Sequence, residues 1–215
     1  MKEKLKNIRL KINKIGSQKR NKKLISNDFS IISNNCYAGI VYQYLNLQYN
    51  TPTIGIYFFA KEYIKFLSNL NYYLDCPLKF IETKQSRYYN ELCKRKQDSV
   101  LIGILDDVEI VFLHYSSEKE AIEKWNRRRK RLSKNLIIKF NDTNLCTQEE
   151  LEDFDNLPYK YKICFTAKKY SHIKCAIWMK KYRLKSEIKE DYYSGHKYFN
   201  IINYVNEFIG DSHEK

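Results

Sequence analysis

Four polar residues with different chemistries follow one another directly: Ser33, Asn34, Asn35 and Cys36. They come after the apolar run 29–32 and before a helical pattern that begins at Gly39, which predicts a strand, a loop and a helix. In α/β proteins the loop after the carboxyl end of a strand is the usual place for a ligand. The free backbone N–H groups at a helix start also favour anions. We therefore expect this loop, together with Tyr37, to bind a substrate.

Cys36 carries the most nucleophilic side chain of this loop. A helix start lowers the pKa of a thiol, so Cys36 is a candidate acyl-accepting nucleophile. Its base would be His114, which we expect at the end of a strand and directly before a helix. The alternative is that Asn34 and Asn35 shape the turn, that Cys36 is a small packing residue and that His114 is a hydrogen-bonded structural residue. The sequence leaves both interpretations open.

A third candidate catalytic residue is Asp142, which follows the apolar run 136–140 and precedes Cys146. Asp153 and Asp155 form a D-x-D pair of the kind that some glycosyltransferases use to hold a metal. They lie in a helical stretch rather than after a strand, so we predict no metal site there. Neither G-x-G-x-x-G nor G-x-x-x-x-G-K-[ST] occurs, and the sequence indicates no particular cofactor.

A run of basic residues surrounds Trp125 in a helix predicted over 117–132. The guanidinium group matches the geometry of phosphate oxygens, so this helix could face a diphosphate or a lipid headgroup. Residues four apart on a helix can also form ion pairs. The alternative is a solvated helix face. The candidate substrate-binding residues of this helix are Glu120, Lys124, Trp125, Arg127 and Arg128.

Strands alternating with helices are expected to position these residues. The predicted strands cover 29–32, 53–59, 136–140 and 161–166, and the predicted helices cover 39–47, 60–74, 117–132 and 198–209. Ser116 or Ser117 is expected to cap the helix over 117–132, because Ser117 and Glu120 have the spacing of a capping box. Thr147 and Glu150 have the same spacing and open one more helix. Residues 100–115 read as a hairpin around Asp106-Asp107, and residues 83–98 lack a pattern. This order predicts an α/β fold, a three-layer α/β/α domain with a mixed sheet over 27–210, followed by a tail over 211–215.

Residues 1–26 are expected to form a basic arm and linker. Residues 1–25 contain ten lysines and arginines against one acidic residue, Glu3. Leu5, Ile8, Ile12 and Ile15 share one face of a helix predicted over 1–16, after which Gly16-Ser17-Gln18 would end it and 19–23 would be a polar linker. A basic amphipathic helix suits an anionic membrane surface. Packing of its apolar face on the domain is the alternative.

Composition excludes several classes of protein. The six cysteines form no C-x-x-C pair, which argues against a zinc finger. The sequence has neither the apolar run of a membrane-spanning helix nor the core of a signal peptide, so we expect a cytoplasmic protein with reduced thiols. The formal net charge is +14. That charge is concentrated in the arm, and no nucleic-acid-binding motif occurs, so binding of nucleic acid is the weakest hypothesis.

Four ordered segments resemble one bacterial family. They are Ile32-Ser33-Asn34-Asn35-Cys36, Phe112-Leu113-His114-Tyr115, Glu120 to Lys124-Trp125 with Arg127-Arg128, and Cys164-Phe165-Thr166-Ala167-Lys168. They are similar to the domain of unknown function 1919, whose members are often labelled exopolysaccharide or capsule biosynthesis proteins. The resemblance covers most of 27–210. It implies a Rossmann-like α/β fold and a role in cell-surface glycan assembly, without naming catalytic residues.

The chain departs from the pattern of that family at three places. Tyr37-Ala38 stands where Trp-Gly is common, and Val111 stands where a second histidine is frequent. The segment 141–146 keeps the Asp and Cys of a Ser-Asp-Arg-Asp-Gly-Cys type sequence but lacks its Arg, second Asp and Gly. If the site of the family lies there, these changes fall on a phosphate- or sugar-binding loop.

Together these observations predict a membrane-associated cytoplasmic transferase, glycosyl or acyl, that acts on precursors of capsule or exopolysaccharide. Its partner would be a sugar or glycan precursor, with or without a diphosphate, and residues 1–16 would contact the anionic membrane. A second hypothesis is a non-catalytic carbohydrate-binding or assembly component of the same pathway. A nucleic-acid-binding protein is the third.

Overall fold

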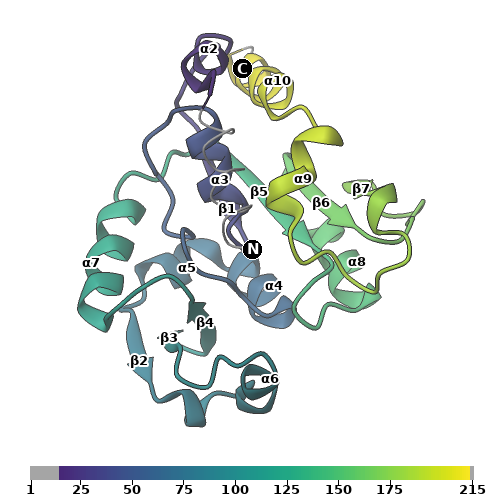
Figure 1. Ribbon diagram of the computed structural model, residues 1–215. Coiled ribbons are helices and arrows are strands. Elements are labelled where there is room, and N and C mark those ends of the chain that lie inside the picture. The colour runs from purple at the N-terminus through teal and green to yellow at the C-terminus, as the bar shows by residue number, and fades with distance from the viewer. Residues whose placement is uncertain (1–14, 214–215) are drawn as a thin grey trace.

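The computed structural model describes residues 15–213 and contains two β-sheets surrounded by helices (Figure 1). A four-stranded parallel sheet has the order β1-β5-β6-β7, and a three-stranded antiparallel sheet has the order β2-β3-β4. The protein is therefore a mixed α/β protein. The strands are β1 (Ser30–Ser33), β2 (Lys79–Ile81), β3 (Leu101–Leu105), β4 (Val108–Phe112), β5 (Leu136–Asn141), β6 (Lys162–Thr166) and β7 (Ala176–Trp178).

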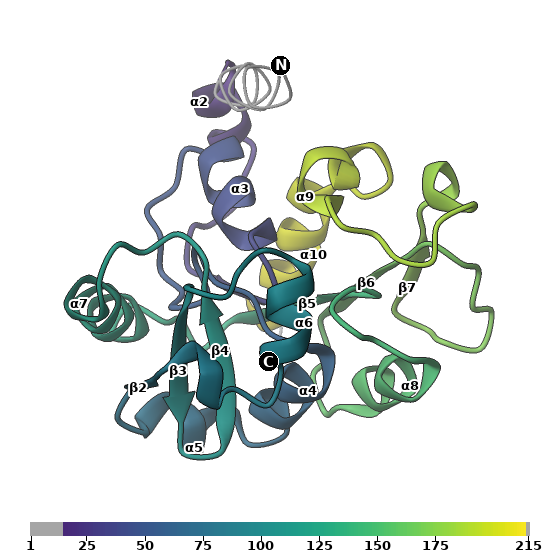
Figure 2. The same cartoon turned by 60° about the horizontal axis from the view of Figure 1, so that its bottom comes forward.

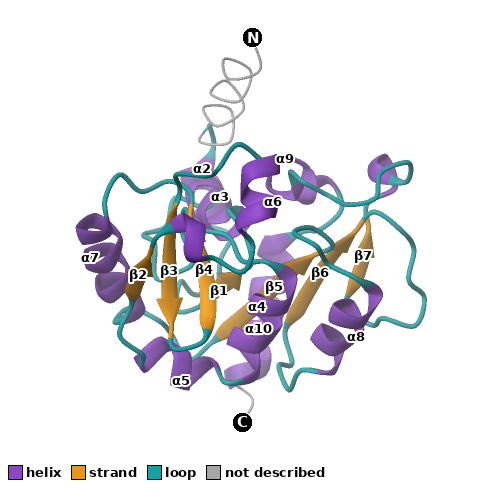
Figure 3. Ribbon diagram, turned by 90° about the horizontal axis from the view of Figure 1, so that it is seen from below, coloured by secondary structure: helices purple, strands orange, loops and turns teal. Residues whose placement is uncertain are grey.

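The expectation of one mixed sheet is wrong, because the hairpin belongs to a sheet of its own. Strands β3 and β4 form the predicted hairpin, with Asp106 in the left-handed conformation (φ 54°) at its turn. They pair with β2, which the sequence analysis did not predict, and not with the parallel strands. Figure 3 shows the two sheets side by side.

The segment 53–59 was predicted as a strand, and this prediction is also wrong. Gly55 has a φ of 74°, which turns the chain out of the extended conformation. Only Tyr57 pairs with another extended residue, Val111, in an isolated bridge. The neighbouring backbone groups bond elsewhere: Phe58 donates to the carbonyl of Asn34, and Gly55 accepts from the N–H of His114. The segment thus connects the end of β1 with the end of β4.

Helices cover both faces of the parallel sheet. On one face, Ile31, Ile137 and Phe165 pack with α3 (Tyr37–Tyr44) and α10 (Ile201–His213). On the other, Ile138 and Phe140 pack with α4 (Ala60–Ser68) and α8 (Gln148–Asn156), and this second core continues to the antiparallel sheet. Successive residues of a strand therefore serve different cores, which is why both Ile31 and Ile32 of β1, and both Ile137 and Ile138 of β5, are apolar.

Local signals for helices are confirmed at α7 (Glu118–Arg129) and α8. The N–H of Glu120 donates to the hydroxyl of Ser117, and Thr147 and Glu150 form the expected capping box. The helix predicted over 60–74 is interrupted at Asn69, which leaves the helical conformation (φ −141°, ψ 55°) and separates α4 from α5 (Leu70–Asp75).

The segment without a sequence pattern, 83–98, is not irregular throughout. It contains η1 (Thr83–Gln85) and α6 (Tyr89–Lys94), which lies beside β4 (Figure 2). Leu92 of α6 is fully buried in a small core with Val111. The short elements η2 (Lys180–Tyr182), α9 (Asp191–Ser194) and η3 (Gly195–Lys197) were also not predicted.

The linker predicted over 19–23 is wrong, because Ser17–Asn21 forms helix α2. Gly16 precedes it in the left-handed conformation, and the Nε of Arg20 donates to the carbonyl of Tyr44 over 2.8 Å. The side chain of Asn21 donates to the carbonyl of Leu45, so α2 is bonded to the end of α3. Most of the helix predicted over 1–16 lies outside the described residues. Within 15–213, no helix combines the length and the apolar character needed to cross a membrane.

Candidate functional site

The carboxyl ends of β1 and β5 lie at the same edge of the parallel sheet, and a buried polar network joins them. The Nζ atom of Lys139, in β5, donates to the side-chain oxygens of Asn34 (3.2 Å) and Asn35 (3.0 Å). It also pairs with the carboxylate of Asp191, at the start of α9, and neither of the two charged side chains is exposed. The amide of Asn34 donates to Asn141 (2.7 Å). This network fixes the 33–36 loop against β5 and α9.

The loop residues that we expected to contact a substrate are mostly engaged with the protein. The hydroxyl of Ser33 donates to the carbonyl of Asn35 (2.7 Å) and accepts from the N–H of Ala38. The amide of Asn35 donates to Asp191 (2.9 Å). Tyr37 is buried, and this burial raises the pKa of its phenol. Three of the predicted contact residues are therefore buried and fix the conformation of the loop: Ser33, Asn34 and Tyr37. None of the three lines either of the two cavities described below.

Cys36 is half-buried and occupies the N-cap position of α3. It lies between two cavities and contributes to the wall of both. Tyr192 of α9 is the other residue that both cavities share. The thiol is thus the one predicted catalytic group that borders both open spaces.

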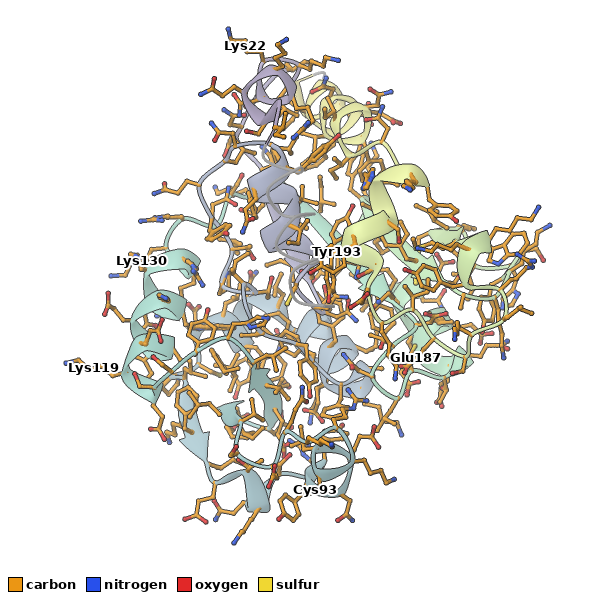
Figure 4. All side chains as sticks on the ribbon, viewed as in Figure 1. Lys22, Cys93, Lys119, Lys130, Glu187 and Tyr193 are labelled. Atoms are coloured by element: carbon orange, nitrogen blue, oxygen red, sulfur yellow. The ribbon has the colours of Figure 1, made fainter. Side chains whose placement is uncertain are left out.

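The first cavity, here the tyrosine cavity, has a volume of about 330 Å³. Its walls bring together Cys36 and His114, the predicted nucleophile and base, from β1–α3 and from the end of the hairpin. Figure 4 shows Tyr193 between α9 and α3. Burial raises the pKa of Tyr192, so its hydroxyl stays protonated and is a hydrogen-bond donor. The residues that define this cavity are Cys36, Gln43, Tyr49, His114, Tyr192 and Tyr193.

The exposed residue His114 owes its place to Gly55. Its N–H donates to the carbonyl of Gly55 over 3.0 Å. A Cβ atom on Gly55 would lie 3.3 Å from the Cβ of His114 and 3.2 Å from the ring of Tyr115. The hydroxyl of Tyr115 donates to the carbonyl of Ile54 over 2.5 Å and accepts from Arg128 (2.6 Å). A glycine at position 55 therefore allows the close packing that places His114 in the wall of the tyrosine cavity.

The second cavity, here the cationic cavity, has a volume of about 440 Å³. Arg95 donates to the side-chain oxygen of Asn144 (2.7 Å) and pairs with Glu91 (2.9 Å). The carboxylate of Glu187 accepts from the hydroxyl of Thr143 (2.9 Å). The residues that define this cavity are Cys36, Lys94, Arg95, Asn144, Glu187 and Lys189.

Asp142, the third predicted catalytic residue, lines neither cavity. Its carboxylate accepts hydrogen bonds from the N–H groups of Ala167 (2.5 Å) and Ile188 (2.9 Å). Burial raises the pKa of Asp142 to about 6, although these two bonds oppose the shift. The side chain joins the loop after β5 to the segments that follow β6 and precede α9.

The basic helix α7 is not brought to either cavity. Arg127 pairs with Glu123 at the surface (3.3 Å), and Lys124 pairs with Glu120, which holds the pKa of Glu120 at about 2. Figure 4 shows Lys119 and Lys130 of this helix directed outward. Trp125 is 1% exposed and packs against Phe112, so its ring has no face for a ligand.

Arg128 is the member of this helix that supports the tyrosine cavity. Its side chain is buried and lies over the ring of Tyr49, with 5.3 Å between the guanidinium carbon and the ring centroid. It also donates to the hydroxyl of Tyr115. Arg128 thus contacts Tyr49, which lines the cavity, and Tyr115, which packs against Gly55 of the cavity wall, but does not line the cavity itself.

Several residues of the site were not predicted from the sequence. Lys139 interrupts the apolar run of β5, and a lysine within a buried strand is a signal that could have been used. Tyr192 and Tyr193 follow no recognisable pattern. Among residues 15–213, no three His, Cys, Asp or Glu side chains gather in an arrangement able to hold a metal ion.

Comparison with known proteins agrees with the resemblance found in the sequence. An uncharacterized protein of Haemophilus influenzae is 31% identical over 192 residues, which cover 87% of this chain and 87% of the relative. Residues 7–209 match the family described as "Domain of unknown function (DUF1919)". This match spans both sheets and both cavities. The chain belongs to the DUF1919 family.

Proposed function

We propose that the protein is an acyltransferase that acts on a saccharide precursor of a cell-surface polysaccharide. The observation that carries this proposal is that Cys36 and His114, which come from different parts of the chain, line the same cavity. A thiol with a neighbouring imidazole is an arrangement that serves acyl transfer. For this reason acyl transfer is preferred here to glycosyl transfer.

The proposed reaction has two steps. In the first, the imidazole of His114 takes the thiol proton of Cys36 while the sulfur attacks the acyl carbonyl carbon of the donor. The bond to the leaving group breaks, the leaving group takes that electron pair and the proton that His114 now carries, and a thioester remains on Cys36. In the second, a saccharide hydroxyl attacks the thioester as His114 takes its proton. The ester leaves, and the proton returns to the thiolate of Cys36.

The tyrosine cavity suits a saccharide acceptor. The rings of Tyr49, Tyr192 and Tyr193 line the cavity and suit the apolar face of a sugar. Gln43 adds an amide that can donate and accept. The same features also favour the second candidate function, a non-catalytic carbohydrate-binding component, which needs no chemistry at Cys36.

The setting of this reaction is part of the proposal. The pattern shared with proteins labelled for exopolysaccharide or capsule biosynthesis supports a role in that pathway. We interpret the parallel sheet with its helices as a Rossmann-like layer arrangement. The protein would act in the cytoplasm, and its basic N-terminal residues would hold it at the anionic membrane where such precursors are assembled.

The test uses p-nitrophenyl acetate as an acyl donor, with mass-spectrometric mapping of the acetyl group. We expect acetylation of Cys36, its loss in Cys36→Ser and a slower reaction in His114→Asn. The matched control is Cys93→Ser, because Cys93 is exposed on α6 and borders neither cavity. Acetylation of Cys93 as fast as that of Cys36 would contradict the proposal.

A saccharide panel separates the two candidate functions. If Cys36 is not acetylated but binding of a saccharide is lost in Tyr193→Ala, the carbohydrate-binding function replaces the enzymatic one. If neither result is obtained, both functions fail.

A further inference from the structure

The cationic cavity plays no part in the two proposed reaction steps, although it shares a wall with the tyrosine cavity. Cys36 and Tyr192 line both cavities. Two ligands, one in each cavity, could therefore both contact the thiol of Cys36. In the proposed reaction the donor and the acceptor both react at the sulfur of Cys36, so each needs a binding site that reaches this thiol. The two cavities provide such a pair of sites.

Three cationic side chains and one carboxylate line this cavity. Lys94, Arg95 and Lys189 are the cations, and Glu187 is the carboxylate. Glu187 is engaged on both oxygens: one pairs with Lys189 (3.2 Å), and the other accepts from Thr143 and from the N–H of Asn144. Glu91, behind the wall, offsets part of the charge of Lys94 and Arg95. The lining therefore retains a positive character.

Arg95 is held in a fixed position. Its guanidinium carbon lies 5.1 Å from the ring centroid of Phe59, while Nε pairs with Glu91 and Nη1 donates to Asn144. A guanidinium group has more N–H donors than these bonds use, so Arg95 retains donors for a ligand. A planar group that is already ordered loses little entropy when it binds phosphate oxygens.

The loop that faces Arg95 is also held in place. Asn144 and Leu145 both have positive φ values, 60° and 64°, and a leucine rarely adopts this conformation. The loop keeps it because Asn144 donates to the carbonyl of Phe58 and accepts from Arg95. The N–H of Ala60 also donates to the carbonyl of Asn144. Contacts to two separate segments, 58–60 and the end of α6, thus hold this wall of the cavity.

We propose that the cationic cavity binds the phosphate-bearing part of the donor, with Arg95 and Lys189 as the residues that contact the phosphate oxygens. This inference rests on the proposed function, because it names the chemistry of the donor whose acyl group Cys36 receives. The sequence suggested a phosphate site on α7. The proposed site lies instead in the wall formed by α6, the loop after β5 and the segment before α9. Figure 4 shows Glu187 on that last segment.

Binding is tested by isothermal titration calorimetry of the full chain with inorganic pyrophosphate and with uridine diphosphate. We expect Lys189→Ala and Arg95→Gln each to weaken binding about tenfold, as the loss of a hydrogen bond to a charged group does. Lys189 is exposed, so its variant should fold even if Arg95→Gln, which also loses the bond to Asn144, does not. The matched control is Lys119→Ala, because Lys119 is exposed on α7 and lines neither cavity.

Three outcomes would overturn the inference: no binding of pyrophosphate at millimolar concentration, equal weakening by Lys119→Ala and Lys189→Ala, or sulfate binding as tight as that of pyrophosphate. Pyrophosphate binding needs no turnover, so it can be observed even if Cys36 is never acetylated. Acetylation of Cys36 without pyrophosphate binding would contradict this inference alone and leave the proposed function standing.

Discussion

Lys139 and Asp191 form an ion pair in which neither side chain is exposed to solvent. The pair connects β5 of the parallel sheet to α9, which carries Tyr192 and Tyr193. Lys139 also donates to both asparagines of the 33–36 loop. The buried ammonium group of Lys139 therefore connects the loop that contains Cys36 to helix α9, which contributes Tyr192 and Tyr193 to the wall of the tyrosine cavity.

The first prediction concerns the loss of one member of this pair. Asp191→Asn leaves a buried ammonium group without its counter-ion, and we expect the free energy of unfolding to fall by about 3–5 kcal/mol. The double variant Lys139→Met, Asp191→Leu removes both charges, and its free energy of unfolding should fall by less than that of Asp191→Asn. Urea unfolding of the three chains measures these differences. A single variant as stable as the parent chain would show that the pair does not hold α9.

The same pair has a predictable pH dependence. Burial lowers the pKa of Lys139, and the nearby carboxylate of Asp191 opposes this shift. Between the folded and unfolded pKa values the unfolded chain binds more protons, so stability rises with pH in that window. Removal of Asp191 lowers the folded pKa further. We therefore expect Asp191→Asn to lower the free energy of unfolding by less at about pH 9 than at about pH 7, as measured by urea unfolding at both values.

Asp142 should show the opposite trend. Its pKa is raised from 3.8 to about 6 in the folded protein, so the folded state binds more protons than the unfolded state between these values. Its contribution to stability is then fully present below about pH 4 and is lost as the pH rises through about 6. A shift of this size corresponds to about 3 kcal/mol.

The non-titrating variant Asp142→Asn isolates this effect. The free energy of unfolding of the parent chain minus that of the variant should decrease by up to about 3 kcal/mol from pH 4 to pH 7. The side-chain amide of the variant loses one of the two hydrogen bonds from backbone N–H groups at every pH. This loss is the same at both pH values, so the effect of the carboxyl group appears only in the change of the difference with pH. A difference that stays constant or increases with pH would contradict the raised pKa.

Interactions between residues close together in the sequence could be predicted, and interactions between residues far apart in the sequence could not. Ser117 with Glu120, and Thr147 with Glu150, lie within one helical turn, so their patterns predicted α7 and α8. Asn35 and Asp191 are 156 positions apart, and no local pattern connects them. The sequence places Asn34 and Asn35 in a polar loop after a strand, but it does not show that Lys139 and Asp191 are their partners. Trp125 was read as a ligand-binding group because its basic neighbours are visible in the sequence and its buried contacts are not.

The predicted membrane contact of the arm needs a truncation that respects α2. A chain that starts at Ile25 would lose the bonds of Arg20 and Asn21 to α3. A chain that starts at Gly16 keeps them and removes the predicted amphipathic helix. We expect the full chain to co-sediment with vesicles containing anionic phosphatidylserine, and the Gly16 chain to remain in the supernatant. Equal co-sedimentation of both would place the lipid-binding residues elsewhere.

The last prediction concerns Gly55, which the sequence analysis did not single out. Its φ of 74° strains any other residue, and an added Cβ would press on His114 and Tyr115. We expect Gly55→Ala to destabilise the protein by about 1–2 kcal/mol. We also expect slower acetylation of Cys36, because the imidazole is displaced from its place in the cavity wall.

Gly210 provides the matched control for this change. It lies in helix α10, and an added Cβ would meet nothing within 4 Å. Gly210→Ala should therefore be neutral or raise stability by up to about 1 kcal/mol, with acetylation unchanged. Thermal unfolding and the acetylation rate are measured on both variants. If Gly55→Ala lowers the melting temperature but acetylates Cys36 at the parental rate, the position of His114 does not limit the reaction, and its role as the base must be abandoned.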